Sequence, residues 1–307
     1  MVRVYSRSIM KVRFGLLVAI IICVFAVGFS VDYNASAQST EPPKGLTLSP
    51  LRTEISTAPG TSFSDQLKVT NSTEKQMTVS FMVEEFKVID EQYDYEFIAE
   101  SNITSWVSFK PSEVVLKAGE AKKVNYTVGI PLTAEPGGYY ISMFASSAVA
   151  AGDGDGNSQQ RVASLLYITA ASDVLGAATR SGHVLSLSSP WLVVDKGAWG
   201  MTLQNAGTTH YRSEYTVKTE DLFGGTVGEN KDSALILPGT IRAIQGEMSL
   251  PSVPGIYRVI YTIGLGDVPG VTETHYMVFL PPWAILTLTT AIVVAGYLSY
   301  RKLSKKH

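Results

Sequence analysis

Apolar and polar residues alternate through much of the 243 residues from Gln38 to Leu280. Apolar side chains recur at every second position in residues 124–130, and residues 140–146 separate Ile141, Met143 and Ala145 from their neighbours in the same way. A period of two places alternate side chains on opposite faces of a β-strand. We find no apolar stripe with helical spacing of useful length in this region. Short strands separated by Gly, Pro, Asn and Ser predict an all-β sandwich or barrel.

The same region repeats itself. Lys117-Ala118-Gly119-Glu120 precedes an alternating strand, and Leu237-Pro238-Gly239-Thr240 does so 120 residues later. Pro136-Gly137-Gly138-Tyr139 and Pro254-Gly255-Ile256-Tyr257 each open a further strand, at an offset of 118. Asn71 and Asn205 end corresponding strands at an offset of 134. Chance similarity of sandwich turns is the alternative, but three signals in the same order favour two domains of one fold.

The predicted fold is therefore two tandem immunoglobulin-like β-sandwich domains, with an N-terminal signal peptide and one C-terminal transmembrane helix. The boundary between the sandwiches is expected near 172–182, where small residues follow a strand. The predicted segments are a signal peptide (1–37), an exposed lead-in (38–45), sandwich 1 (46–175), sandwich 2 (180–280), a transmembrane helix (281–300) and a basic cytoplasmic tail (301–307).

The N-terminal segment has the three parts of a signal peptide. Four basic residues precede the apolar run 16–27, and Ala35 and Ala37 form an A-x-A site for cleavage before Gln38. An uncleaved N-terminal anchor is the alternative.

The apolar segment Trp283 to Tyr300 carries no charge and is close to the ~20 residues that cross a bilayer as a helix. Four of the seven residues after it are Lys or Arg, which is the positive-inside signature. A buried strand or core helix is the alternative. We expect a single-pass cell-membrane protein with an extracytoplasmic bulk and a cytoplasmic C-terminus.

Composition excludes several classes. The only cysteine, Cys23, lies in the signal peptide, so disulfides and cysteine metal sites are excluded from the mature chain. Between Gln38 and Leu280, 17 basic residues face 26 acidic ones, a net charge of −9. Such a field repels nucleic acid, which is therefore not an expected partner.

In layout the chain resembles the WxL-interacting proteins of Gram-positive bacterial surfaces. Residues 46–50 through 69–72, with 114–130 and 136–139, resemble the first domain of that family. The resemblance implies a peptidoglycan-binding first domain and a second domain that binds other proteins. It supplies an architecture and a partner class but matches no functional residue.

Motifs for catalysis and metal binding are absent from the sequence. His183, His210, His275 and His307 have no zinc-site spacing, and no nucleophile elbow or P-loop occurs. Residues 153–157 place oxygen side chains at alternate positions, but Ser158 and Ser164 occupy the positions where an EF-hand requires Gly and Glu. We expect a plain hairpin loop there, no metal, no cofactor and no enzyme, although a catalytic triad assembled only in space stays open.

The most distinctive segment is 84–100, in which seven acidic residues are interleaved with aromatic ones. Aromatic rings beside carboxylates suit sugar stacking or protein contact. The alternative is a solvated hairpin whose rings face its own sandwich. The candidate binding residues are Tyr93, Asp94, Tyr95, Glu96 and Phe97.

Asn71, Asn102 and Asn125 each begin an N-glycosylation sequon. The predicted function is a membrane-anchored binding or adhesion protein that tethers cell-wall polymer (peptidoglycan) or another surface protein. A membrane-anchored chaperone or assembly factor for exported proteins, or a structural subunit of a surface complex, is the alternative.

Overall fold

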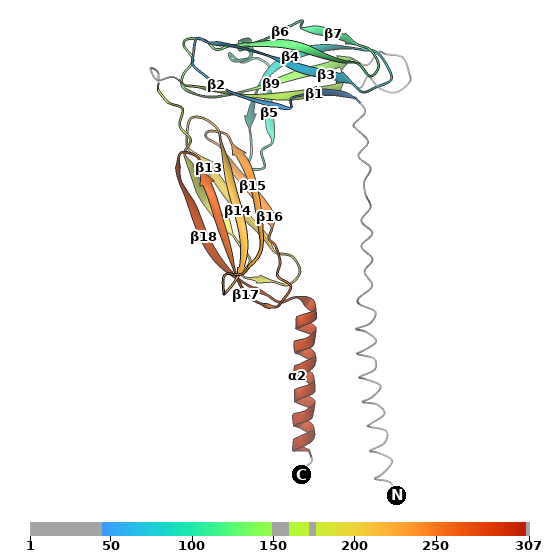
Figure 1. Cartoon of the computed structure of the whole chain (residues 1–307), viewed down its shortest axis with the longest axis vertical. Coiled ribbons are helices and arrows are strands. Elements are labelled where there is room, and N and C mark those ends of the chain that lie inside the picture. Colours follow the sequence, from blue (N-terminus) through green and yellow to red (C-terminus); the bar gives the residue numbers. More distant parts are fainter. Residues whose placement is uncertain (1–44, 149–159, 172–175, 305–307) are drawn as a thin grey trace. The chain divides into compact units, whose positions relative to one another are not determined.

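The computed structural model describes residues 45–148, 160–171 and 176–304 (Figure 1). Within these ranges the chain forms two immunoglobulin-like β-sandwiches followed by one helix, which confirms the predicted fold class. The expected signal peptide, the loop at 153–157 and the end of the basic tail lie outside the described residues.

The first sandwich consists of two sheets. Sheet A has the strand order β1-β3-β8-β6, and sheet B has the order β2-β10-β9-β4-β5, with β7 also paired to β4. A 3₁₀ turn, η1 (Thr104–Trp106), precedes β6. The strands are β1 (Leu46–Ser49), β2 (Arg52–Thr57), β3 (Ser62–Asn71), β4 (Met77–Val88), β5 (Tyr95–Ile98), β6 (Val107–Lys110), β7 (Glu113–Leu116), β8 (Ala121–Gly129), β9 (Gly137–Ala148) and β10 (Gln160–Ala170).

The second sandwich also consists of two sheets. Sheet C has the order β11-β13-β16, and sheet D has the order β12-β18-β17-β14-β15. The strands are β11 (Gly182–Ser188), β12 (Leu192–Val193), β13 (Ala198–Asn205), β14 (Tyr211–Asp221), β15 (Thr226–Ile236), β16 (Ile241–Glu247), β17 (Gly255–Leu265) and β18 (Val268–Phe279). Strand β10 ends at Ala170 and β11 begins at Gly182, on either side of the expected boundary.

In both sandwiches the first two strands follow each other directly in the sequence but belong to different sheets. Strand β1 pairs with β3 in sheet A, and β2 then pairs in parallel with β10 in sheet B. Strand β11 pairs with β13 in sheet C, and β12 then pairs in parallel with β18 in sheet D. The switch closes one edge of each sandwich, which limits the unpaired backbone that an edge strand presents.

The alternation seen in the sequence separates core from surface. Val124, Tyr126 and Val128 of β8 are all buried against sheet B. Ile141 and Met143 of β9 point into the same core, and Leu166 and Ile168 of β10 join them. The intervening residues of these strands therefore face away from the core.

The repeated asparagines make equivalent corners. The side-chain amide of Asn71 donates hydrogen bonds to the carbonyls of Lys75 and Lys117, at 2.7 and 2.9 Å. The amide of Asn205 donates to Thr209 and Ile236, both at 2.9 Å. Both side chains are fully buried. Each asparagine thus links the backbone carbonyls of neighbouring turns from inside its corner.

The other repeated signals have equivalent geometry too. Gly119 and Gly239 have φ angles of 69° and 70°, in the left-handed region that favours glycine. The Tyr139 hydroxyl donates to the Glu135 carbonyl, and the Tyr257 hydroxyl donates to the Val253 carbonyl, each at 2.8 Å. These are tyrosine corners, in which a tyrosine at the start of a strand binds backbone just upstream.

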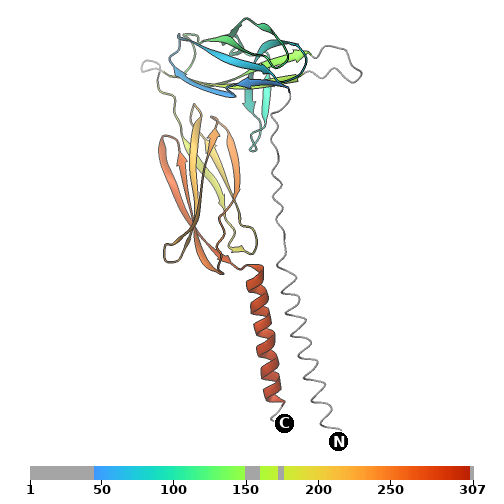
Figure 2. The same ribbon diagram turned by 45° about the vertical axis from the view of Figure 1, so that its right-hand side comes forward.

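Helix α2 (Pro282–Leu303) follows the second sandwich (Figure 2). Pro282 lies at its start, where proline is favoured, and Arg301 and Lys302 lie in its last turn, where positive charge suits the helix dipole. The helix has a mean hydropathy of 1.5 over an 18-residue window that has no buried residue. By length and composition it can cross a membrane.

Candidate functional site

Sheet B has aromatic side chains on its outer face, which is the face turned away from the core. Strand register places Met82 opposite Phe144 and Phe86 opposite Phe97. Tyr140 lies opposite Tyr167. All these side chains point away from the core, because the residues that alternate with them point inward.

The second sandwich covers part of this face. Phe86, Tyr140 and Tyr167 form a buried cluster with Leu235 and Leu237 of the second sandwich. Burial raises the pKa of Tyr140 and the pKa of Tyr167 well above the ordinary value for tyrosine. The two sandwiches belong to one compact unit, and this cluster is the hydrophobic part of their contact.

Tyr93, one of the predicted binding residues, belongs to the same contact. It is only 7% exposed, in the β4–β5 turn, with a φ of 71°. Its hydroxyl accepts a hydrogen bond from the backbone N–H of Leu237 and lies 2.8 Å from Oγ1 of Thr240. The guanidinium of Arg242 lies over its ring, 4.3 Å from the centroid. With its ring and hydroxyl both engaged, Tyr93 joins the sandwiches and is closed to an external ligand.

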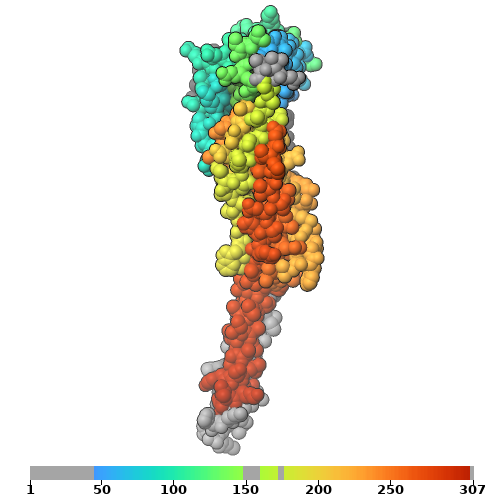
Figure 3. Space-filling model, turned by 90° about the vertical axis from the view of Figure 1, so that its left-hand side faces the viewer, coloured from blue at the N-terminus to red at the C-terminus, as the bar shows by residue number. Residues whose placement is uncertain are grey.

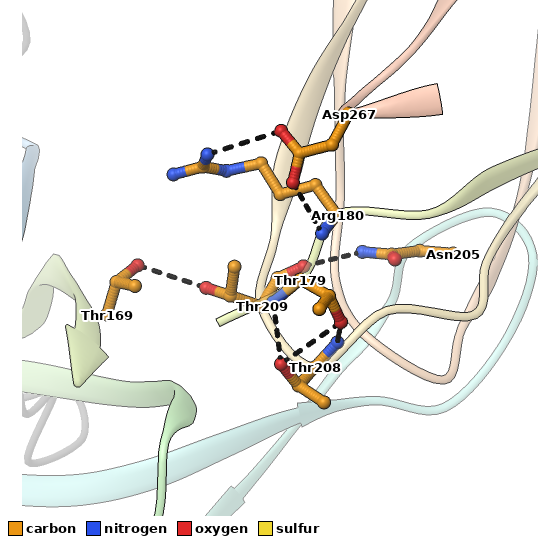
Figure 4. A network of polar contacts seen from close by, with 7 residues as sticks. All are labelled: Thr169, Thr179, Arg180, Asn205, Thr208, Thr209 and Asp267. Carbon is orange, nitrogen blue, oxygen red and sulfur yellow. Dashed lines mark hydrogen bonds and ion pairs between the residues drawn. The ribbon is translucent and has the colours of Figure 1, made fainter. Parts of the chain in front are cut away.

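Polar contacts extend this junction. The Tyr140 hydroxyl accepts a hydrogen bond from the backbone N–H of His210 at 3.1 Å and lies 3.3 Å from its Nδ1. Burial is the main cause that lowers the pKa of His210. The hydroxyls of Thr169 and Thr209 meet at 3.0 Å (Figure 4). The Gly138 N–H donates a hydrogen bond to the Thr208 carbonyl. A neutral imidazole fits these surroundings better than a charged one.

The rest of the outer face is open, and we call it the aromatic face. Tyr95 and Phe97 are 36% and 40% exposed. Tyr95 packs edge-on against Phe86, and Phe97 packs edge-on against Phe144. The aromatic face consists of Met82, Glu84, Tyr95, Phe97, Phe144 and Arg161.

A cation covers its centre. The Arg161 guanidinium lies 3.4 Å from the centroid of the Phe144 ring and forms an ion pair with Glu84. The planar group thereby stacks on an aromatic ring while its charge is balanced.

Beside the aromatic face lies a pocket of about 310 Å³, which we call the arginine pocket. Glu54 is the acidic group next to it and lies 3.6 Å from Arg52 and 3.5 Å from Arg212. Two of the three guanidinium groups of the pocket thus share one carboxylate, while the third, Arg242, donates a hydrogen bond to the Leu235 carbonyl. The pocket is lined by Leu51, Arg52, Tyr95, Leu165, Tyr167, Arg212, Ser233, Leu235 and Arg242.

The other predicted binding residues have different positions. Asp94 is exposed in the β4–β5 turn, and its N–H binds the carboxylate of Asp90. Glu96 is exposed and alternates with Tyr95 and Phe97, so it points away from the aromatic face. Of the five candidates, Tyr95 and Phe97 lie together on one open surface. The arginines come from strands up to 190 positions apart (Arg52 and Arg242), so no local sequence signal could have grouped them.

Of the three sequon asparagines, Asn71 has a buried side chain that is not accessible for glycosylation. Its amide nitrogen is bonded to buried carbonyls, and its Oδ1 accepts from the backbone N–H of Thr73. Asn102 and Asn125 are exposed. A glycan on Asn71 would require this corner to open.

One strand edge in the first sandwich lacks a ladder partner over part of its length, although the Gln160 side chain accepts a hydrogen bond from the Leu46 N–H and the Ser164 hydroxyl donates to the Pro50 carbonyl there. Strand β10 pairs with β9 along its whole length but with β2 only from Leu165 onward. Its first five residues, 160–164, are therefore paired on one side only among the described strands. The Leu165 N–H points to the β2 side, where it binds the Leu51 carbonyl, so the N–H groups of Arg161 and Ala163 face the same side.

The described residues contain no group of three or more His, Cys, Asp or Glu side chains that could hold a metal ion. The site is therefore an arrangement of rings, guanidinium groups and strand edge.

No family model and no curated protein matches this chain. Among solved structures it is similar to the class 5 fimbriae chaperone CfaA, with 10% identity, a TM-score of 0.43, and coverage of 75% of this chain and 98% of the other. It is also similar to a chain of the Salmonella enterica complex of SafA pilin with the SafB chaperone (10%, TM-score 0.39, coverage 78% and 98%). The E. coli chaperone DraB matches at 11% identity and a TM-score of 0.37, with coverage of 76% and 96%. With identities and TM-scores this low, the likeness carries no argument about activity or partner.

Proposed function

We propose that the protein is a membrane-anchored extracytoplasmic binding protein that holds another exported protein against its aromatic face. The observation that carries this proposal is the pair of partly exposed rings, Tyr95 and Phe97, on a surface that continues into the arginine pocket.

The composition of this surface favours a protein partner. Tyr, Phe, Met and Arg are the residue types enriched where proteins meet. Met82 and Leu51 add exposed apolar area that a polyhydroxylated glycan would not use. Cell-wall polymer, the partner class implied by the resemblance to WxL-interacting proteins, is therefore the second outcome of the test.

The arginine pocket would fix the orientation of the bound partner. Arg52, Arg212 and Arg242 concentrate positive charge in a chain whose ectodomain carries −9 overall. Guanidinium groups bind carboxylates with fixed geometry. An acidic side chain or C-terminal carboxylate of the partner is the group that fits.

Helix α2 supplies the anchor in this proposal. A span followed by Arg301, Lys302, Lys305 and Lys306 has the charge pattern of a helix with a cytoplasmic C-terminus. Anchoring confines both sandwiches to the layer near the membrane and raises the effective concentration for weak contacts.

The test is affinity capture of the full-length chain from its native membranes in mild detergent. Tyr95→Ala combined with Phe97→Ala should lose a protein that the wild type captures. Leu185→Ser, which replaces an exposed apolar residue on β11 of the second sandwich, is the control and should keep it. Equal capture by both variants would overturn the proposal, and loss of retention on isolated cell wall alone would assign a polymer instead.

A second candidate is an assembly factor that pairs with a strand of its client. The backbone at 161–163, which has no ladder partner on one side among the described strands, favours it, because an extended peptide can add to such an edge. Ala163→Pro removes an N–H that faces the open side, and proline is tolerated at edge positions of this kind. Strand addition requires that this variant keep the wild-type Tm and lose the client; a variant that keeps both rules it out.

A further inference from the structure

One end of the second sandwich presents an apolar rim. Strand β12 pairs with the last residues of β18, so that Leu192 lies opposite Val278, and the Trp191 carbonyl accepts a hydrogen bond from the Val278 N–H. Ile256 of β17 lies opposite the same Val278 on its other side. The rim therefore surrounds the end of the strand that leads into α2.

The turn between β14 and β15 reaches the same end. Asp221 lies opposite Tyr257 in the register, close to the start of β17. The residues Leu222 and Phe223 follow Asp221 and are both exposed. The terminal rim, as we define it, consists of Trp191, Leu192, Leu222, Phe223, Val253 and Ile256.

Phe223 is held out into solvent by its turn. Its side chain is 99% exposed. The Asp221 carboxylate accepts hydrogen bonds from the N–H groups of Phe223 and Gly225, both at 2.8 Å, and Gly224 has a φ of 90°. Such a turn presents the phenyl ring instead of letting it fold back onto the sandwich.

The connection from the rim to α2 is short. Strand β18 ends at Phe279 and the helix begins at Pro282, so two residues, Leu280 and Pro281, join them. The Leu280 N–H binds the Val193 carbonyl, and Pro281 is buried. Two residues span at most about 7 Å even when extended. In Figure 3 the segments around residues 190 and 225 lie on either side of the start of α2.

These distances match a lipid surface. The headgroup layer on each side of a bilayer is about 5–8 Å thick, from the difference between the total and hydrocarbon thickness. Trp283, in the first turn of α2, is the residue type that lies at the membrane boundary. The end of β18, which the rim surrounds, therefore lies within about 7 Å of the start of α2, and this places it at headgroup depth, where tryptophan and phenylalanine side chains partition.

We propose that the terminal rim is a membrane-contact surface that lies in the lipid headgroup layer and fixes the second sandwich on the bilayer. This inference rests on the proposed anchoring by α2. The exposed Asp195 and Lys196 in the neighbouring loop carry opposite charges, and the Asp221 carboxylate is bound by the N–H groups of its own turn, so the contact depends on apolar side chains and not on lipid charge. The sandwiches are then held in one orientation to the membrane instead of swinging on a stalk.

The test uses the full-length chain with Cys23→Ser, reconstituted into phosphatidylcholine vesicles. A fluorescent label is attached at Phe223→Cys, and at Leu185→Cys on β11 as the matched control. Because the Phe223 ring is almost wholly exposed, its replacement leaves the fold intact. Relative to the control, the label at 223 should be quenched several-fold less by aqueous iodide and several-fold more by brominated lipid.

The outcomes separate the two proposals. A chain that alkaline carbonate extracts from the vesicles would overturn the anchor and the rim contact together. A chain that resists extraction but shows iodide quenching at 223 equal to that at 185 would overturn the rim contact alone. Protection from iodide without quenching by brominated lipid would overturn it as well and would assign a second copy of the chain as the cover.

Discussion

Asn71 and Asn205 show how one side chain can hold a corner of each sandwich. Both are buried and donate to carbonyls of neighbouring turns. Asn71→Ala and Asn205→Ala should each lower the free energy of unfolding by about 1–3 kcal/mol, because each removes at least two side-chain hydrogen bonds from a buried corner. Chemical denaturation of the full-length chain measures this, with the exposed Asn102→Ala as the control, for which a change within about 0.5 kcal/mol is expected. Equal effects of all three would contradict the role of the corners.

Removal of a single atom, the hydroxyl oxygen of Tyr93, tests the junction between the sandwiches. Tyr93→Phe keeps the ring under Arg242 but removes the acceptor of the Leu237 N–H. An unpaired buried N–H should lower the unfolding free energy by about 1–3 kcal/mol. The matched control is Tyr276→Phe, whose hydroxyl lies on an exposed side chain. If thermal unfolding does not distinguish the two variants, the hydroxyl of Tyr93 has no structural role.

His210 gives the junction a pH dependence. Its pKa is lowered, mainly by burial, while Glu54 opposes the shift and Arg180, Arg212 and Arg52 add to it. Above the unfolded-state pKa of about 6.5 the imidazole is neutral in both states and the stability is complete. As the pH falls through that value the unfolded chain takes up the proton first, so stability is lost.

His210→Asn keeps a hydrogen-bond acceptor near the Tyr140 hydroxyl but cannot titrate. The loss of Tm between pH 8 and pH 5 should therefore be smaller in this variant than in the wild type. Parallel pH profiles for the two proteins would show that His210 does not control the junction.

At the scale of strands and turns, the repeated glycines predict the direction in which Gly→Ala changes alter stability. Gly119→Ala and Gly239→Ala force alanine into the left-handed region and should each destabilise the chain by about 1 kcal/mol, although neither new methyl group meets another atom. Gly129→Ala, in β8, is the control, since its φ is not positive and the space beside it is also open. Relief of unfolded-chain entropy should leave that variant unchanged or slightly more stable. Destabilisation of all three by the same amount would refute a cause in the backbone conformation.

Local patterns predicted the strands well but not their partners. The alternation in residues 140–146 correctly separates the core side chains from those on the outer face, because period two is a property of a single strand. The pairing of β2 with β10 joins residues more than 110 positions apart and has no local signal. Tyr93 shares the aromatic character of Tyr95 and Phe97, and only tertiary contacts show that it is closed while they are open. The arginine pocket could not be predicted for the same reason.

At the scale of the whole molecule, our proposal gives helix α2 and the aromatic face separate roles. Helix α2, which has the length and composition of a membrane span, would limit where the sandwiches can be. The aromatic face, with the arginine pocket beside it, would select what they hold. Because the second sandwich covers part of sheet B, the open part is a bounded surface and not the whole sheet.

Site-specific photocrosslinking in native membranes tests the binding claim most directly. A photoreactive phenylalanine analogue at position 97 lies on the aromatic face, and the same analogue at Leu185 lies on β11 of the second sandwich, outside it. Our account predicts that the chain labelled at 97 forms a crosslink to a specific exported protein, which the chain labelled at 185 does not form. No crosslink at 97, or the same products at both positions, would contradict it.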